Sequence, residues 1–237
     1  MTDATERFAE RARRERQARR RRMARRSAAV VAPLVLIATV GFSPLLDVDE
    51  VRIVGTSRLP RDQVVAAARI PDGRALALVD LDEVRRRVRS LSYVRSARVR
   101  RQWPGRVVIE VHERVPALAV PVGGGVALYD AEGVRLGGAR SVPRGVPLLR
   151  VAGGRPTAEL VQTVVAVVGT IPADIRRHVL GYSATSPDDV TFALVGGREV
   201  VWGSAEDGAA KALVLPALLR RPGTHYDVRA PTAPAVR

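Results

Sequence analysis

The stretch that decides the fold of the first half of this chain is VRSARVRRQWPGRVVIEVHE, residues 94–113. In Arg106–Glu113 every second side chain is apolar, which is the period of a strand with one buried face. Trp103-Pro104-Gly105 predicts a turn before it. Val94–Arg101 predicts the strand on the other side of that turn. The stretch is therefore expected to form two strands joined by a turn.

Upstream of this stretch, the sequence predicts one more strand and two helices. Val48–Gly55 alternates in the same way and predicts a strand. Pro60 opens a helix predicted over Arg61–Arg69, since the missing N–H of proline does no harm in a first turn. A second helix is predicted from Asp80, whose carboxylate can cap it, with Glu83 as capping-box partner. Its apolar stripe and its solvent faces consist of Leu81, Val84, Val88 and Leu91, and of Arg85, Arg86, Arg87 and Arg89.

Further upstream lies SAAVVAPLVLIATVGFSPLL, residues 27–46, which contains no charged residue. As a helix it would reach ~30 Å, the thickness of a bilayer's hydrocarbon core. Residues 1–26 hold eleven arginines and four acidic residues, whereas the other flank begins with Asp47, Asp49 and Glu50. Positive charge stays on the cytoplasmic side. We therefore predict a transmembrane helix in the cell membrane, with the N-terminus inside and residues 47–237 outside.

Two other interpretations of this stretch are weaker. A cleaved signal peptide needs a small-x-small site after its apolar core, and the chain reads GFSPLL after Val40. A buried helix of a soluble protein carries a polar face, for which this stretch offers only Thr39 and Ser43. The basic tail, residues 1–26, is too polar for a core and is expected to be disordered unless bound. The arginines expected to contact lipid headgroups are Arg21, Arg22, Arg25 and Arg26.

The net charge of +15 suggests nucleic acid as one class of partner. The tail alone supplies +7 of this charge, eleven arginines minus four acidic residues. Binding of single strands also needs aromatic residues among the basic ones. The chain has three Phe, four Tyr and two Trp, and they are scattered. We therefore expect no nucleic-acid partner.

The second half predicts a mixture of short strands and helices. Gly123–Gly125 predicts a turn, and Gly196-Gly197 predicts a two-residue hairpin turn. The predicted strands are Val126–Asp130, Gly133–Leu136, Pro147–Val151, Val179–Ala184, Val190–Val195, Arg198–Gly203 and Tyr226–Arg229. The predicted helices are Thr157–Gly169, Pro172–His178 and Ser204–Arg220. Pro231 and Pro234 are then expected to lie in a frayed tail.

The order of elements and several motifs resemble those of the FtsQ/DivIB family of bacterial cell-division proteins. The residues that carry the resemblance are VRIVG at 51–55, LVDL at 78–81, YVRSARVRRQWPG at 93–105 and VIEVHERVPA at 108–117. The resemblance implies an α+β protein with a POTRA (polypeptide-transport-associated) domain. The expected layout is a cytoplasmic tail (1–26), a transmembrane helix (27–46), a POTRA domain (47–116), a second extracytoplasmic α+β domain with a mostly antiparallel sheet (117–230) and a disordered tail (231–237).

The resemblance also implies a binding site. A short last strand leaves a sheet edge with unpaired backbone groups, which is either guarded or used to accept another strand. In the family, the final strand binds the extracytoplasmic part of an FtsB-like partner, and Asp227-Val228-Arg229 matches the family's Asp-x-Arg. Arg229 is then expected to pair with a partner carboxylate. Ala230 departs from members with an aromatic residue there, so the anchor contact made by that residue is expected either to be missing or to be replaced by Tyr226.

Motifs typical of enzymes are missing from the sequence. The three histidines, His112, His178 and His225, are too far apart for a metal motif, and no Walker or nucleophile-elbow motif is present. We therefore expect no catalytic residue, cofactor or metal. The function that the resemblance implies is a divisome scaffold at the septum that binds FtsB/FtsL-type partners, other divisome membrane proteins and the lipid bilayer. The alternative is a membrane-tethered POTRA chaperone for exported polypeptides.

Overall fold

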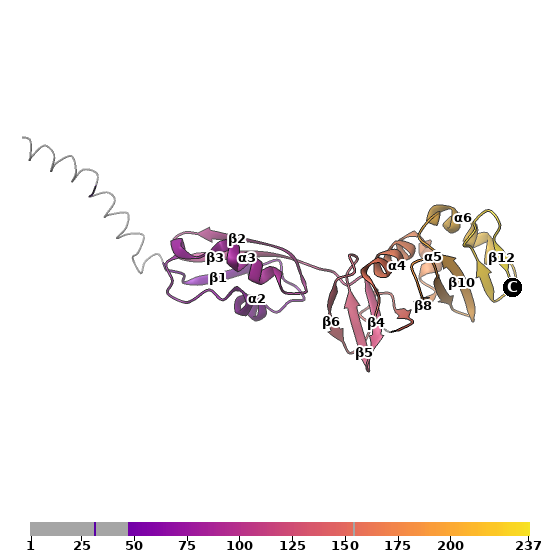
Figure 1. The fold of residues 1–237 in the computed structure, drawn as a ribbon, viewed down its shortest axis with the longest axis horizontal. Helices are drawn as coiled ribbons and strands as arrows, with labels where there is room; N and C mark the ends of the chain where they lie inside the picture. Colours follow the sequence, from indigo (N-terminus) through magenta and orange to yellow (C-terminus); the bar gives the residue numbers. More distant parts are fainter. Residues whose placement is uncertain (1–30, 32–46, 154) are drawn as a thin grey trace, which may run out of the picture. The chain divides into compact units, whose positions relative to one another are not determined.

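The computed structural model of the chain describes residue 31 and residues 47–153 and 155–237 (Figure 1). Apart from residue 31, the predicted transmembrane segment and the basic tail lie outside these ranges. Within them, no helix has both the length and the apolar character needed to cross a membrane. The chain divides into two compact units, one formed by residues up to 88 with 97–111 and the other by residues 89–96 with 112–237.

Residues 50–113 form a three-stranded sheet with two helices, in the predicted β-α-α-β-β order. The elements are β1 (Glu50–Val54), α2 (Arg61–Ala68), the 3-10 turn η2 (Leu76–Leu78), α3 (Leu81–Arg89), β2 (Val94–Gln102) and β3 (Arg106–Glu113). The spatial order is β1-β3-β2, with β1 parallel to β3 and Glu50 opposite Arg106. Val108, on the opposite face of β3, is buried as well as the predicted Val107 and Ile109.

Helix α3 has the predicted cap and buried face. The Asp80 Oδ1 accepts the backbone N–H groups of Asp82 and Glu83, both at 3.0 Å. Val88 is fully buried and faces the core. The prediction for Arg87 was wrong, since this side chain is not on a free solvent face. It is ion-paired with Glu83 one turn earlier, and its Nη1 lies 3.4 Å from the carbonyl oxygen of Ala68 at the end of α2.

The second unit contains two sheets. The first is antiparallel, with order β4-β5-β6, and consists of β4 (Leu118–Val122), β5 (Gly125–Tyr129) and β6 (Arg135–Ala139). The second has six strands in the order β12-β11-β10-β9-β8-β7: β7 (Leu149–Val151), β8 (Val179–Ala184), β9 (Val190–Leu194), β10 (Arg198–Gly203), β11 (His225–Asp227) and β12 (Ala235–Val236). The pairs β7–β8 and β10–β11 are parallel and the other three are antiparallel.

One apolar core joins both sheets to the helices of this unit, which are α4 (Ala158–Thr170), α5 (Ala173–Arg176) and α6 (Gly208–Leu218). Thr157 caps α4 as predicted, its Oγ1 accepting the N–H of Leu160 at 3.2 Å. Three buried aromatic rings, of Tyr182, Phe192 and Trp202, follow one another across β8, β9 and β10 at centroid distances of 5.9 and 6.2 Å. Such tilted pairs add to the burial of the rings.

The C-terminal residues differ from the prediction of a disordered tail. Residues 235–236 form β12, which pairs antiparallel with β11 and lies beside it in Figure 1. The N–H of Ala233 donates to the carbonyl of Ala230 at 3.0 Å, so Pro231 stands at the second position of a turn. Proline is favoured there because its φ matches the turn. The prolines that predicted fraying instead reverse the chain and bring it back along β11.

Candidate functional site

The predicted partner-binding strand is not the edge of its sheet. Tyr226 lies opposite Val200 of β10 on one side and opposite Val236 of β12 on the other. The backbone groups of β11 are therefore shared between two neighbours. This corrects the expectation that Tyr226–Arg229 itself presents a free edge, and in the described part of the chain that position belongs to β12.

Two of the four predicted partner-binding side chains are buried. Tyr226 is 1% exposed and Val228 is fully buried, and both belong to the apolar core. The Tyr226 hydroxyl lies 2.9 Å from the carbonyl oxygen of Arg221 and 2.8 Å from that of Gly223, so it closes the loop between α6 and β11. These two side chains hold the strand in place. They do not offer a surface to another chain.

Asp227 and Arg229 point to the exposed face of the sheet and pair with each other. The Arg229 Nη2 lies 2.6 Å from Asp227 Oδ2, its Nε lies 3.1 Å from both carboxylate oxygens, and its backbone N–H donates to Oδ1 at 3.0 Å. These hydrogen bonds from Arg229 hold the pKa of Asp227 below its usual value. The carboxylate in turn raises the pKa of the Arg229 guanidinium. Arg229, which was predicted to pair with a carboxylate of the partner protein, is thus already paired with the carboxylate of Asp227 in its own chain.

Gly203 at the end of β10 makes room for this arginine. A Cβ at position 203 would stand 2.8 Å from Arg229 Cγ and 3.4 Å from the carbonyl oxygen of Asp188. Its φ of +77° also lies in the left-handed region that favours glycine. The aliphatic part of Arg229 therefore lies across the backbone of β10, which fixes where its charged end can reach.

A shallow hollow of about 400 Å³ lies on this face of the sheet. It is lined by Val201, His225, Tyr226, Asp227, Arg229, Ala235 and Arg237. The strand period places His225 and Asp227 outward and Tyr226 inward, so the floor of the hollow is mainly the solvent face of β10, β11 and β12. Its charged groups of both signs suit a polar peptide segment better than a compact apolar ligand.

At the outer edge of β12, the backbone N–H and C=O of Val236 have no strand neighbour among the described residues. His225 and Arg237 exchange both backbone hydrogen bonds, at 2.9 Å each. In an antiparallel ladder, alternate residues direct their N–H and C=O to opposite sides. The N–H and C=O of Val236 therefore point away from β11. Pro234, the preceding outward position, has a carbonyl but no N–H.

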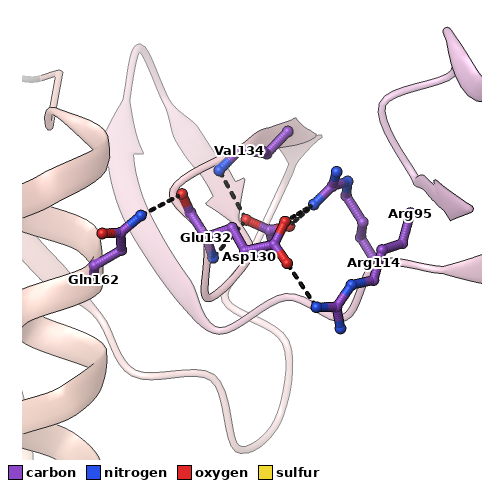
Figure 2. Close-up of polar contacts among 6 residues, drawn as sticks. All are labelled: Arg95, Arg114, Asp130, Glu132, Val134 and Gln162. Atoms are coloured by element: carbon purple, nitrogen blue, oxygen red, sulfur yellow. Dashed lines mark hydrogen bonds and ion pairs between the residues drawn. The ribbon is translucent and has the colours of Figure 1, made fainter.

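A second polar cluster surrounds Arg114 in the same unit (Figure 2). The Arg114 Nη1 lies 2.5 Å from Asp130 Oδ2 and 2.7 Å from Glu132 Oε2, and Arg95 Nη2 lies 2.6 Å from Glu132 Oε1. Asp130 is only 5% exposed, and its Oδ1 accepts the N–H groups of Glu132 and Val134 at 3.0 and 2.8 Å. The cluster fastens the chain that leaves β3 to the turn between β5 and β6.

The charges of this cluster stabilise one another, which is typical of a structural ion-pair network. Glu132, and then Asp130, raise the pKa of Arg114, while Arg114 and Arg95 lower the pKa of Glu132. Gln162 on α4 donates to the carbonyl oxygen of Glu132 at 3.1 Å. Every strong charge here has an opposite partner within the chain. In the described ranges, no three His, Cys, Asp or Glu side chains gather as they would around a metal ion.

Comparison with known proteins decides the family. A family model described as "POTRA domain, FtsQ-type" matches residues 46–114. The chain is 40% identical to Cell division protein FtsQ of Streptomyces bingchenggensis over 204 residues, which cover 82% of this chain and 77% of the relative. It is 39% identical to the Streptomyces griseus protein of that name, covering 82% and 98%, and 34% identical to that of Mycolicibacterium smegmatis, covering 83% and 59%. The chain belongs to the FtsQ family of cell division proteins.

Family membership confirms the resemblance drawn from the sequence, the POTRA domain and a role in cell division. The α+β class is confirmed by the fold, with sheets that are mixed and antiparallel. The partner of the β11–β12 region stays a prediction, and so does the membrane-spanning segment. Asp130, Glu132 and Arg114 were not predicted to meet, although Arg114 lies in the stretch 108–117 that carries the family resemblance.

Proposed function

We propose that this chain is a non-enzymatic scaffold of the divisome. It crosses the cell membrane once, with the N-terminus in the cytoplasm and the C-terminus outside, and it binds FtsB/FtsL-type bitopic partners and other divisome membrane proteins during septum formation. Its membership in the FtsQ family supports the division role. The uncharged residues 27–46 and the arginine-rich tail support the topology.

The observation that carries the proposed binding mode is the outward N–H and C=O of Val236 on β12. An extended segment of the partner adds to this edge through backbone hydrogen bonds. Specificity then comes from the hollow beside it, where side chains of the added strand meet Asp227, Arg229 and Arg237. The edge is short and flanked by proline, which are the features that discourage pairing with unselected strands.

Arg229 keeps a role in this binding mode in spite of its internal partner. Its contacts with Asp227 use Nε and Nη2. Nη1 is therefore left to meet a partner carboxylate, and the guanidinium is already oriented by Asp227 and by the close approach to Gly203. An oriented arginine loses less rotamer freedom on binding than a free one. Asp227 is thus a positioning residue for the contact.

The test is the affinity of the full chain in nanodiscs for a peptide from the extracytoplasmic part of an FtsB-like partner. Val236→Pro removes the outward N–H, which an edge strand tolerates, and also the valine side chain, which packs against the core. Val236→Ala, which keeps the N–H and loses the same packing, is therefore its control. The proline variant should weaken binding by about 1–3 kcal/mol, since the partner's carbonyl is left unpaired. Ala235→Pro removes an inward N–H and should loosen β12 itself. Unchanged affinity for Val236→Pro would show that the partner binds elsewhere.

A charge reversal tests the second contact. Arg229→Glu should weaken peptide binding roughly tenfold or more, mostly through faster dissociation. Arg140→Glu is the matched control, because Arg140 is also an exposed arginine of the same unit. A reciprocal acidic-to-arginine change in the peptide should restore part of the affinity lost with Arg229→Glu. Equal affinities for the two variants would remove Arg229 from the site.

A membrane-tethered POTRA chaperone would also use strand addition. Imaging separates the two functions, because a scaffold of the divisome should form rings at midcell. A uniform signal along the envelope would favour the chaperone. The FtsQ relatives support the first outcome.

A further inference from the structure

The two tryptophans of the chain have opposite environments. Trp202 is fully buried in the core of the second unit, whereas Trp103 exposes 53% of its surface in the turn between β2 and β3. A tryptophan that is half exposed leaves a large apolar ring in contact with water. Such rings are favoured where one side is apolar and the other is wet, as at a protein interface or a membrane–water interface.

The turn that carries Trp103 is fastened to the residues that directly follow the uncharged stretch. The carbonyl oxygen of Gly105 accepts the N–H groups of Asp49 and Glu50, at 2.8 and 3.2 Å. A Cβ at position 105 would stand 2.3 Å from Asp49 Oδ2 and 2.8 Å from the carbonyl oxygen of Asp47. The turn and residues 47–49 therefore pack backbone to backbone, and only glycine permits this approach.

A second contact fixes the same residues from the other side. The N–H of Val48 donates to the carbonyl of Arg74 at 2.9 Å, and Asp47 forms a β-bridge with Ala75. Residues 47–50 are thus held in place by backbone hydrogen bonds on both sides. Three residues span at most ~10 Å when fully extended. Gly105 can therefore lie no further than about that distance, plus one hydrogen bond, from the end of the stretch 27–46.

We propose that Trp103 and its turn dock in the outer headgroup region of the bilayer. This inference rests on the membrane anchorage contained in the proposed function. The headgroup layer is roughly 5–8 Å deep on each side of the hydrocarbon core, which is within reach of a turn tied this closely to the end of the span. Docking would hold the first unit against the membrane at a second point besides its covalent link.

Charge is not the basis of this contact. Arg106 is ion-paired with Glu50, with Nη2 and Oε2 at 2.6 Å. The guanidinium of Arg101 is occupied by the carbonyl oxygens of Leu76 and Val79, at 2.9 and 2.6 Å. The ring of Trp103 is therefore the main group that the turn offers to lipid. Docking should be the same in vesicles of zwitterionic lipid alone and in vesicles with anionic lipid added.

The experiment is tryptophan fluorescence of the full chain in phosphatidylcholine vesicles, with lipids brominated near the headgroup as the quencher. Because Trp202 is buried, quenching of the wild-type chain reports Trp103. We expect the emission of Trp103, taken as wild type minus Trp103→Phe, to shift to shorter wavelength, to lose intensity with shallow bromolipid and to resist aqueous iodide. Leu213→Trp in the Trp103→Phe background is the control, because Leu213 is 82% exposed on α6. Its emission should respond to iodide and not to bromolipid.

The outcomes separate this inference from the anchorage. If the full chain still floats with the vesicles after an alkaline carbonate wash, it is anchored in the membrane. If it floats while Trp103 responds to iodide and not to bromolipid, the docking is overturned and the anchorage stands. If it does not float, the proposed topology fails and the docking with it. A thermal melt of Trp103→Phe that matches the wild type shows that the difference spectrum reports the ring and not unfolding.

Discussion

Strands β3 and β12 are built in opposite ways. β3 has eight residues, a neighbour on each side and fully buried side chains at Val107 and Ile109. β12 has two residues, one described neighbour and no fully buried side chain, and it follows a proline turn. β3 is held by apolar burial, whereas β12 is held by backbone hydrogen bonds to β11 and by the partly buried side chain of Val236. A strand of the first kind gives the unit its stability, and one of the second kind can adapt to a partner.

The largest effect is expected where apolar burial is broken. Val88 on α3 is fully buried. Val88→Asp would bury a carboxylate without a partner, which costs several kcal/mol and is comparable to the stability of a whole domain. The first unit should then unfold at room temperature. Limited proteolysis and a urea titration followed by circular dichroism would measure this loss.

Arg86→Asp is the matched control for that substitution. Arg86 lies on the same helix and is exposed. The same aspartate should there cost less than about 1 kcal/mol, as is usual for surface positions. Arg87, which the sequence placed on a solvent face, is unsuitable because it is paired with Glu83. Similar urea midpoints for the Val88 and Arg86 variants would contradict the observed orientation of α3.

The same contrast explains which strands the sequence could predict. The first and last residues of β3 and β8 were predicted correctly. The signals for such strands are alternating apolar and polar side chains and clear turns beside the strand. β4 was missed because Leu118, Ala119 and Val120 are all buried, so the strand shows no alternation. Proline at position 121 also argues against a strand unless it lies at an edge. β12 was missed because a two-residue strand has no period at all.

An intermediate effect is expected at the cluster around Arg114. Asp130→Ala would leave the guanidinium of Arg114 without its buried carboxylate and would remove the acceptor for the N–H groups of Glu132 and Val134. Removing one partner of a largely buried pair costs about 3 kcal/mol. The second unit should melt earlier in calorimetry. Glu132→Gln, at an exposed position, should shift the melt much less, and equal shifts would mean that Asp130 has no special role.

The candidate site was only partly predictable, for a related reason. The sequence predicted a strand over Tyr226–Arg229, whereas β11 ends at Asp227, and Arg229 lies two residues beyond that end and pairs with Asp227. Which neighbours flank that strand depends on the turn at Pro231, a proline that was predicted to lie in a frayed tail. Arg114 and Asp130 are sixteen residues apart. Their pairing depends on where the β5–β6 turn lies in the folded unit. No local sequence pattern predicts this ion pair.

The smallest effect concerns the Asp227–Arg229 ion pair at the end of β11, and it is measured through its pH dependence. The folded-state pKa of Asp227 is lowered, chiefly by the hydrogen bonds from Arg229. A lowered pKa contributes stability that is fully present above the unfolded pKa, near 3.8, and is lost as the pH falls through the folded value. Asp227→Asn cannot make this contribution at any pH.

The difference in unfolding free energy between wild type and Asp227→Asn should therefore be constant from pH 7 to 5 and shrink below pH 4. Urea titrations at each pH measure it, with Asp174→Asn, an exposed aspartate on α5, as control. A difference that stays unchanged down to pH 2.5 would mean that the Asp227–Arg229 pair, and with it the orientation of Arg229 toward a partner, is not maintained in solution.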